Sequence, residues 1–386
     1  MKIDINKDVR RFADEMVQTR HAIHRQPELG NKEVETAARI ERFLVNHGIE
    51  TQRVLGTAVV GTLRGALPGK TVALRADIDA LPIQEETGAA FTSVMQGRMH
   101  ACGHEVHTAA VLGAAAVLAA HREELAGNVV FLFQPDEEGN GGAARLIDRG
   151  CLDGVDAIFG AHVSPDLPEG HAGFCYGKFY AASDMFELTV TGKSAHGADR
   201  EKGIDALAAA AELVTELLAL PAKVTEDRCV VTVGTLQSGT AGNILAGSAR
   251  MTGIVRTLGK ETRQRLKEAF FETVERVSEA HGTKTEIRYR QSYPGIVNDP
   301  AMAALAERAA AELLEEAQIH RISRPTMTTE DFGYYLDRVP GAFYHIGAGS
   351  EEPLHSPLFL PSDRAVTTAA AVHVAVVLDF LTGGDA

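Results

Sequence analysis

The order of the expected helices and strands changes twice along the chain, and this feature most restricts what the chain can fold into. Expected strands accompany expected helices before about residue 183 and again after Pro294, a mixture that predicts an α/β layered domain. The strands are expected at residues 50–54, 58–63, 71–74, 128–133, 157–163 and 342–346, and the main helices at 31–48, 104–120, 301–316 and 365–381.

Between these two parts, the expected elements follow a different order. Phe186, Leu188 and Val190 alternate with polar residues, which indicates a strand with one buried face. The order strand, helix, strand, strand, helix, strand is the split βαβ, ferredoxin-like motif. Its later elements are expected at residues 203–220, 229–236, 249–258, 266–282 and 285–290. We therefore predict a domain made of residues 1–182 plus 293–386, interrupted by an α+β domain at residues 183–292.

Length and composition agree with this organisation. A chain of 386 residues, 45 % of them hydrophobic, has enough apolar material for two domains. Its net charge of −14 repels nucleic-acid phosphates and anionic lipid surfaces, so we expect neither as a partner. The first residues lack a secretory apolar region, the apolar run at 109–120 is too short to span a membrane, and the four cysteines show no C-x-x-C spacing. We expect a cytoplasmic protein.

The segment MHACGHEVH, residues 99–107, stands at the start of an expected helix and concentrates residues that can bind metal. Gly103 lets the backbone fold tightly, so that a cysteine and a histidine can meet one ion. The alternative is a buried cysteine beside partly exposed histidines at a helix start. The candidate ligands are His100, Cys102, His104, Glu105 and His107.

A second segment, QPDEEG, follows the apolar strand at 128–133. Charged residues just past the carboxyl end of a strand stand where α/β folds place their sites. Because adjacent carboxylates point in different directions, one of Glu137 and Glu138 can bind metal while the other moves a proton. A solvated acidic loop is the alternative.

Three further places carry candidate residues. His162 ends an apolar strand, a position that a core histidine occupies more often than a metal ligand does. His355 is held in a loop between two prolines. Asp77 and Asp79 close another strand, where they could orient metal ligands or simply pair with Arg75.

Taken in order, eight segments resemble the M20 metallopeptidase family, and most closely its subfamily D of amidohydrolases that cleave N-acyl amino acids. The similarity runs from about His24 to the C-terminal helix and includes the inserted domain. The segments are HRQPELG, LRADIDALP, MHACGHEVH, QPDEEG, GAHVSP, SAHGA, TEDFGYYL and PLHSP.

The resemblance implies a mixed-sheet catalytic domain with a two-metal site and an inserted lid or dimerisation domain. Glu137 matches the general base of the family, and Asp77 matches an aspartate that supports the site from behind a ligand histidine. Zinc or manganese is expected, and the mixed ligand set also admits nickel or cobalt. The residues that match metal ligands are Cys102, His104, Glu138, His162 and His355.

The resemblance also assigns substrate-binding residues to the inserted domain. His196 matches a histidine that closes over the site or reaches that of a partner subunit, so a homodimer through this domain is expected. Asn243 and Arg256 match positions that hold the substrate carboxylate, although a strand arginine paired with a glutamate is an equal alternative. Glu105, Asp136, the residues after His196 and residues 361–364 depart from the common pattern, which bears on the substrate more than on the reaction.

These observations predict a metal-dependent amidohydrolase that releases an amino acid from an N-acyl, N-aroyl or N-acetyl conjugate. Deacetylation of N-acetyl-diaminopimelate and carboxypeptidase action on a dipeptide are alternatives within the same class. A catalytically silent metal-binding homologue is less compatible with the intact Glu137. A Cys102 nucleophile with His104 as its base has poor geometry, because the two residues are only two positions apart.

Overall fold

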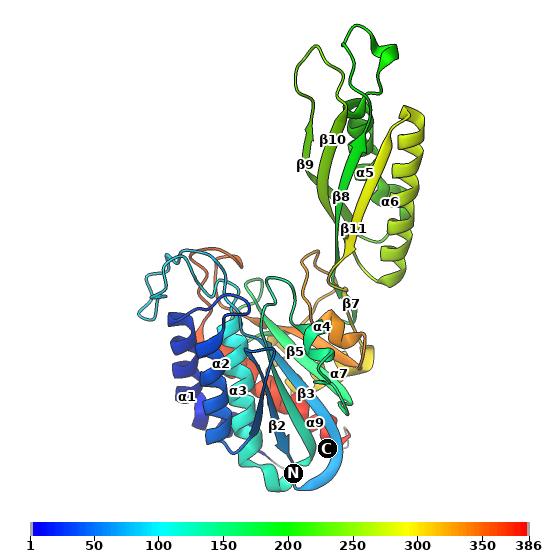
Figure 1. The fold of residues 1–386 in the computed structure, drawn as a ribbon. Helices are drawn as coiled ribbons and strands as arrows, with labels where there is room; N and C mark the ends of the chain where they lie inside the picture. The colour runs from blue at the N-terminus through cyan, green and yellow to red at the C-terminus, as the bar shows by residue number, and fades with distance from the viewer. Residues whose placement is uncertain (1–2, 384–386) are drawn as a thin grey trace. The chain divides into compact units, whose positions relative to one another are not determined.

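The computed structural model describes residues 3–383, which divide into two compact units (Figure 1). The first unit contains the residues up to Gly177, Val297–Arg324, and the residues from Asp331 onward. The second unit contains Lys178–Ile296 and the short segment Pro325–Glu330. Each unit has its own hydrophobic core.

The first unit is built on a mixed sheet of eight strands in the order β1-β2-β4-β3-β5-β14-β6-β13. Its centre is parallel, because β3 pairs in parallel with β4 and β5, and β14 pairs in parallel with β5. The carboxyl ends of these strands therefore meet at one edge, where α/β folds place their sites. The bounds are β1 (Glu50–Val54), β2 (Ala58–Arg64), β3 (Leu67–Asp77), β4 (Ala126–Gln134), β5 (Ala157–Ser164), β6 (Ala172–Phe174), β13 (Ile319–Arg321) and β14 (Gly341–Gly347).

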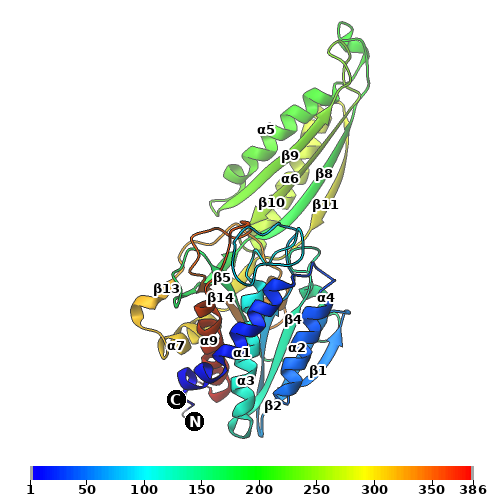
Figure 2. The same cartoon turned by 90° about the vertical axis from the view of Figure 1, so that its left-hand side faces the viewer.

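Helices cover this sheet, and the most buried of them is α3. Every residue of α3 from His104 to Leu118 is buried, because α1 and α9 pack beside it (Figure 2) and β3 of the sheet also contacts it. An apolar surface on all sides is typical of such a central helix. The helices are α1 (Ile5–Arg25), α2 (Val34–Asn46), α3 (His104–Ala120), α4 (Ala143–Ile147), α7 (Pro300–Ala311), α8 (Gly333–Leu336) and α9 (Asp363–Thr382).

By length and composition alone, α9 is able to cross a membrane. The apolar run at 109–120, considered in the sequence, is too short to do so. Most of α9 is nevertheless buried inside the unit, against α3, α1 and α7. Its His373 accepts or donates a hydrogen bond of 2.7 Å with Tyr344 of β14. These contacts are those of a core helix.

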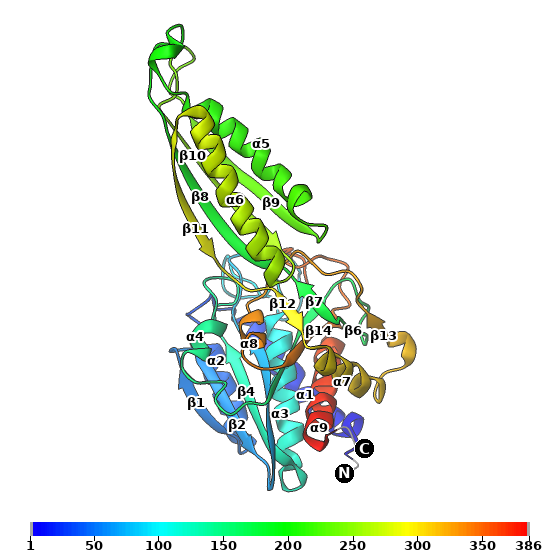
Figure 3. The ribbon, with the colours of Figure 1, turned by 90° about the vertical axis from the view of Figure 1, so that its right-hand side faces the viewer.

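The second unit contains a four-stranded antiparallel sheet in the order β11-β8-β10-β9, with α5 and α6 packed side by side on it (Figure 3). Its core includes Leu213, Phe270 and Val274 from the two helices. Along the chain the elements are β8 (Ala182–Thr191), α5 (Ala206–Val224), β9 (Cys229–Ser238), β10 (Ser248–Thr257), α6 (Lys260–His281) and β11 (Lys284–Gln291). Two short strands, β7 (Gly177–Tyr180) and β12 (Ile296–Asn298), form a separate two-stranded sheet where the chain passes between the units.

Several expected boundaries differ from the structure, among them the following three. Helix α2 begins at Val34 after the N-cap Glu33, because Asn31 has a φ of 61° and lies in the preceding turn. Helix α7 ends at Ala311, five residues earlier than expected, and Glu315 caps a separate 3₁₀ turn. Strand β3 already begins at Leu67.

Candidate metal centre and active site

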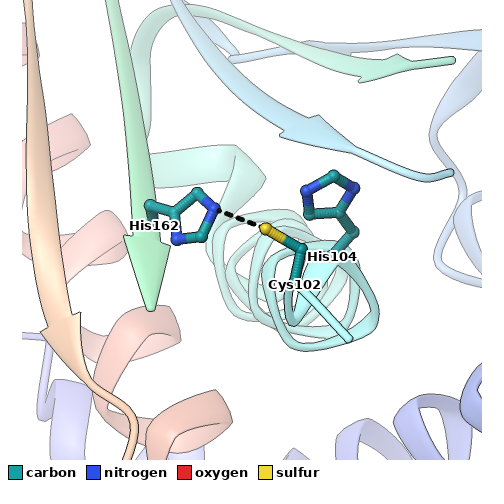
Figure 4. Close-up of side chains that lie close together, drawn as sticks. All are labelled: Cys102, His104 and His162. Atoms are coloured by element: carbon teal, nitrogen blue, oxygen red, sulfur yellow. Dashed lines mark hydrogen bonds between the residues drawn. The ribbon is translucent and has the colours of Figure 1, made fainter. Parts of the chain in front are cut away.

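Cys102 and His104 flank a glycine whose conformation no other residue adopts easily. Gly103 has a φ of 89°, and a Cβ atom built on it would lie 2.4 Å from Cγ2 of Val163. The tight turn places Cys102 just before α3 and His104 at its first position. Sγ of Cys102 lies 3.4 Å from Nε2 of His162, which is on the neighbouring strand β5 (Figure 4).

The backbone fixes the orientation of both histidine rings. Nδ1 of His104 lies 2.9 Å from the carbonyl oxygen of Asp79, and Nδ1 of His162 lies 2.7 Å from that of Val163. Because a carbonyl only accepts hydrogen bonds, each Nδ1 carries the proton and donates it. In both rings, Nε2 is therefore the nitrogen that can bind a metal.

Two adjacent carboxylates follow β4. The chain turns at Asp136, which has a φ of 62°, and the backbone N–H of Glu138 then donates to Oδ2 of Asp79 at 3.0 Å. Oε1 of Glu138 lies 3.9 Å from Nε2 of His104. Glu137 is buried, with 7 % of its surface exposed. The two carboxylates thus lie at the carboxyl edge of the sheet, beside the start of α3.

His355 reaches the same place from the C-terminal part of the chain. Its backbone has a φ of 66°, and its N–H donates to the carbonyl of Ala101 at 2.8 Å, which ties its loop to the loop before α3. Nε2 of His355 lies 3.1 Å from Oε1 of Glu138, and half of the His355 side chain is exposed. His355 is therefore the most accessible member of the site.

The structure brings together the five residues that the family resemblance predicts as ligands, and the predicted base Glu137 with them. Their ligand atoms form overlapping groups, and within each group all ligand atoms lie within 4.8 Å of one another. Two of the groups share Cys102, so they offer two neighbouring places for a cation. The groups are Cys102, His104 and His162; Cys102, Glu138 and His355; and His104, Glu137 and Glu138.

The chemistry of these residues fits divalent metal ions. Nε2 of His104 is buried and has no hydrogen-bond partner among the described residues, and the buried Oε1 of Glu138 has only its contact with His355. Leaving such atoms unpaired costs free energy, which a bound cation would recover. Sulfur, imidazole and carboxylate together suit transition-metal ions rather than magnesium or calcium.

The pKa shifts describe the site without a cation. Burial raises the pKa of the Cys102 thiol well above its usual value, and the Glu138 and Glu137 carboxylates raise it further. Burial lowers the pKa of His104, but Asp77 and Asp79 outweigh it and raise this pKa to about 10. In the absence of a cation, Cys102 is therefore a thiol and His104 an imidazolium. A thiol that contacts His162 rather than His104 is poorly placed as a nucleophile activated by His104.

Asp77 both pairs with Arg75 and supports a histidine. Its Oδ2 accepts from Nη1 of Arg75 at 2.8 Å, and its Oδ1 accepts from Nδ1 of His107 at 2.6 Å. Burial raises the pKa of Asp77, but the nearby cationic groups of His104 and Arg75 hold it well below the usual range. The histidine that Asp77 supports is thus His107, whereas the group behind His104 is the carbonyl of Asp79.

Two other candidates from the MHACGHEVH segment do not belong to the ligand groups. Glu105 is fully buried and accepts from Nδ1 of His24 at 3.1 Å and from Nε of Arg20 at 3.3 Å, both on α1. His100 is buried, and its ring nitrogens have no hydrogen-bond partner among residues 3–383. Asp331, a buried neighbour of the site, received no role from the sequence, although its TEDFGYYL segment was among those that carried the resemblance.

The predicted substrate-binding residues all belong to the second unit. His196 forms a bridge with Ile244, and the N–H of Gly197 donates to the carbonyl of Asn243 at 2.8 Å, so the structure brings His196 and Asn243 together. Both are exposed. Arg256 lies on β10 and donates to Oγ of Ser183 on β8.

Comparison with known proteins identifies the family of the chain. Residues 73–379 match the family described as Peptidase family M20/M25/M40. The chain belongs to this family. The resemblance found in the sequence motifs is thereby confirmed. As an M20 member with a fitting ligand set, the chain is a metal-dependent hydrolase that acts on amide bonds.

Relatives of this M20 chain are similar along nearly their whole length. An N-acetylcysteine deacetylase of Bacillus subtilis (strain 168) is 38 % identical over 363 residues, which cover 93 % of the chain and 95 % of that protein. Thermostable carboxypeptidase 1 of Saccharolobus solfataricus is 32 % identical over 388 residues, covering 97 % and 98 %. The crystal structure of a dinuclear metal-binding M20 peptidase from Bacillus subtilis is similar with a TM-score of 0.87 and 35 % identity, covering 97 % and 99 %.

Proposed function

We propose that the protein hydrolyses the amide bond of N-acyl amino acids, with Glu137 as the general base. The observation that carries this proposal is the group formed by His104, Glu137 and Glu138, whose ligand atoms lie within 4.8 Å of one another. A carboxylate that is buried beside a ligand set, without being needed as a ligand, is placed to move a proton. The similarity to a deacetylase supports the substrate class.

Divalent ions held by Cys102, His104, Glu138, His162 and His355 would lower the pKa of a water molecule and polarise the amide carbonyl. Glu137 accepts the proton of that water and returns it to the leaving amine, because an amide nitrogen leaves only when it is protonated. Asp79 orients two of the ligand residues, through its carbonyl to His104 and through Oδ2 to the N–H of Glu138. We propose zinc or manganese as the metal, with nickel or cobalt also compatible with these ligands.

A chelator and two substitutions test this function. The purified protein should hold about two divalent ions per chain and lose activity with a chelator. Glu137→Gln should keep the metal and lose turnover, whereas the neighbouring Glu138→Gln should lose metal as well. Hydrolysis of N-acyl amino acids by fully metal-depleted protein would refute the proposal, and so would a Glu137→Gln enzyme of normal rate.

Carboxypeptidase action on dipeptides is the second candidate, and the similarity to a carboxypeptidase favours it. Acetyl-, benzoyl- and indoleacyl-amino acids, N-acetyl-diaminopimelate and dipeptides, assayed side by side, distinguish the candidates. We expect the highest kcat/KM with an N-acyl amino acid. If a dipeptide has the highest kcat/KM, the result favours carboxypeptidase activity.

For the second unit we propose a role as a ferredoxin-like lid and dimerisation domain, with residues 183–292 as its extent. Support comes from its strand–helix–strand–strand–helix–strand order and from the family resemblance. Within it, His196, Asn243 and Arg256 would bind substrate, with Arg256 suited to a bidentate contact with a carboxylate. Arg256→Ala should raise KM more than it lowers kcat, and a monomeric mass in solution would contradict the homodimer.

We also propose a cytoplasmic location for the protein. All four cysteines are free, as expected in a reducing compartment. Cell fractionation would test this.

A further inference from the structure

Asp331 is a fully buried carboxylate that receives hydrogen bonds from three separate segments of the first unit. Nη2 of Arg75, on β3, donates to its Oδ1 at 2.8 Å. Nε2 of Gln134, the last residue of β4, lies 2.9 Å from Oδ1 and 2.8 Å from Oδ2. The backbone N–H groups of Gly142 and Ala143 donate to Oδ2 at 2.9 and 3.0 Å.

These partners lie at the two ends of one loop. Gln134 immediately precedes residues 135–141, and Gly142 and Ala143 immediately follow them at the start of α4. The two ends approach so closely that a Cβ atom on Gly142 would lie 2.0 Å from the carbonyl oxygen of Pro135. One carboxylate therefore closes the base of the loop that carries Glu137.

Arg75 connects this closure to the rest of the site. Its Nη1 donates to Oδ2 of Asp77 at 2.8 Å, and its Nε donates to Oε1 of Gln134 at 3.0 Å. The guanidinium is buried and planar, so it holds two carboxylates and an amide in a fixed arrangement that a lysine cannot reproduce.

Within the loop, the two glutamates have different surroundings. Glu138 is held directly, through its N–H, by Asp79. Glu137 has a carboxylate oxygen within 4.8 Å of one of Asp331, so it lies beside the closed base of the loop. Any change in the closure of the loop would therefore be felt first at Glu137.

We propose that Asp331, with Arg75, is the positioning residue for Glu137: it closes the loop at residues 135–141 and thereby fixes the general base relative to the ligand groups. This inference rests on the proposed role of Glu137. Asp331 itself touches neither substrate nor metal in this scheme, and it acts through the loop.

Asp331→Asn tests the proposal, because it keeps the shape but replaces one accepting oxygen by an NH₂ group that faces N–H donors. We expect kcat to fall about 10- to 100-fold, with KM and metal content little changed. In metal-free protein, the amides of Gly142 and Ala143 should lose protection from hydrogen exchange. Asp79→Asn should show the opposite pattern, with metal lost first. Protection and kcat both at wild-type values in Asp331→Asn would overturn the proposal.

A double-mutant cycle separates positioning from general destabilisation. If Asp331 acts through Glu137, Asp331→Asn should have almost no further effect on the residual rate of Glu137→Gln. An undiminished effect in that background would overturn the proposal. Should Glu137→Gln itself retain the normal rate, the proposed function fails instead, and the two failures are thereby distinguished.

A second variant and a control complete the test. Arg75→Lys keeps the charge but cannot bridge Asp77 and Asp331, so it should also lower kcat and expose the two amides. It decides the question if Asp331→Asn does not fold. Tyr344→Phe removes another buried hydrogen bond of the first unit, to His373, and should destabilise the protein without lowering kcat. A wild-type kcat in a folded Arg75→Lys would overturn the proposal.

Discussion

Nδ1 of His107 donates to Oδ1 of Asp77 over 2.6 Å, while Nε2 of the same ring accepts the backbone N–H of Val163 at 2.9 Å. Both ring nitrogens are therefore engaged inside the protein. Although His107 lies in the same short motif as Cys102 and His104, it has no nitrogen left for a metal ion. Its contacts make it a support for Asp77, which Arg75 holds from the other side.

His107→Phe should keep the metal but bind it about 10- to 100-fold more weakly, because a phenyl ring fills the space without holding Asp77. His104→Ala removes a ligand and should weaken binding much further. Competition with a metal-sensitive dye measures both affinities. Equal losses in the two variants would mean that His107 is itself a ligand.

Metal binding should release protons. At neutral pH the metal-free site holds a proton on Nε2 of His104, whose pKa is raised to about 10, and one on the Cys102 thiol, whose pKa is also raised. Because a cation must displace both, its affinity should increase with pH by about two orders of magnitude per pH unit near neutrality.

Calorimetric titration in two buffers of different ionisation enthalpy counts the released protons, and we expect about two for the wild type. Cys102→Ala should release about one fewer. A binding enthalpy that does not depend on the buffer would contradict this account of the metal-free site.

Gly103→Ala should damage the site more than an equally strained glycine substitution elsewhere. Gly103 and Gly56 have φ values of 89° and 87°, so alanine at either position costs about 1–2 kcal/mol of backbone strain. A Cβ on Gly56 meets nothing within 4 Å, whereas one on Gly103 collides with Val163.

The comparison of the two variants isolates the collision. Urea unfolding should show a larger loss in the free energy of unfolding for Gly103→Ala than for Gly56→Ala. Metal titration should show weaker binding in Gly103→Ala alone, because Cys102 and His104 flank this glycine. Equal losses of stability and unchanged metal affinity would show that the Val163 side chain moves aside.

Long elements with a regular pattern could be predicted from the sequence. Helix α3 was expected at 104–120 and is found at His104–Ala120, because an apolar run follows a glycine that can begin a helix. Strands β6 and β13, with three residues each, were not expected. A three-residue segment shows no period, and only pairing with neighbours in the sheet makes it a strand.

The same distinction applies to the site. The five ligands that the family resemblance predicts stand in short motifs, and each is a residue type that binds metal. The local sequence and the resemblance were therefore enough to propose them. The pairing of Arg75 with Asp331 joins residues 256 positions apart. No local pattern records which distant donor a buried carboxylate meets, so the support of the Glu137 loop could be found only in the folded structure.

Glu33 makes a final prediction about pH and stability. This fully buried carboxylate accepts from Oγ1 of Thr57 at 2.8 Å and from the N–H of Asp136 at 3.1 Å, yet burial raises its pKa from 4.5 to about 7. A pKa that is higher in the folded state means that the protonated form favours folding. The stabilisation that the protonated Glu33 contributes to the folded state is complete below about pH 4.5 and is lost as the pH rises to about 7.

Over that range, ionisation of Glu33 should lower the free energy of unfolding by up to about 3 kcal/mol. Glu33→Gln cannot ionise, so its stability relative to the wild type should increase from pH 4.5 to pH 7 and then stay constant. Urea unfolding of both proteins across this range measures the difference, and the comparison cancels the opposing contributions of other carboxylates. Parallel pH profiles for the two proteins would show that Glu33 has the same pKa in the folded and the unfolded protein, because only a difference between the two pKa values makes the profiles diverge.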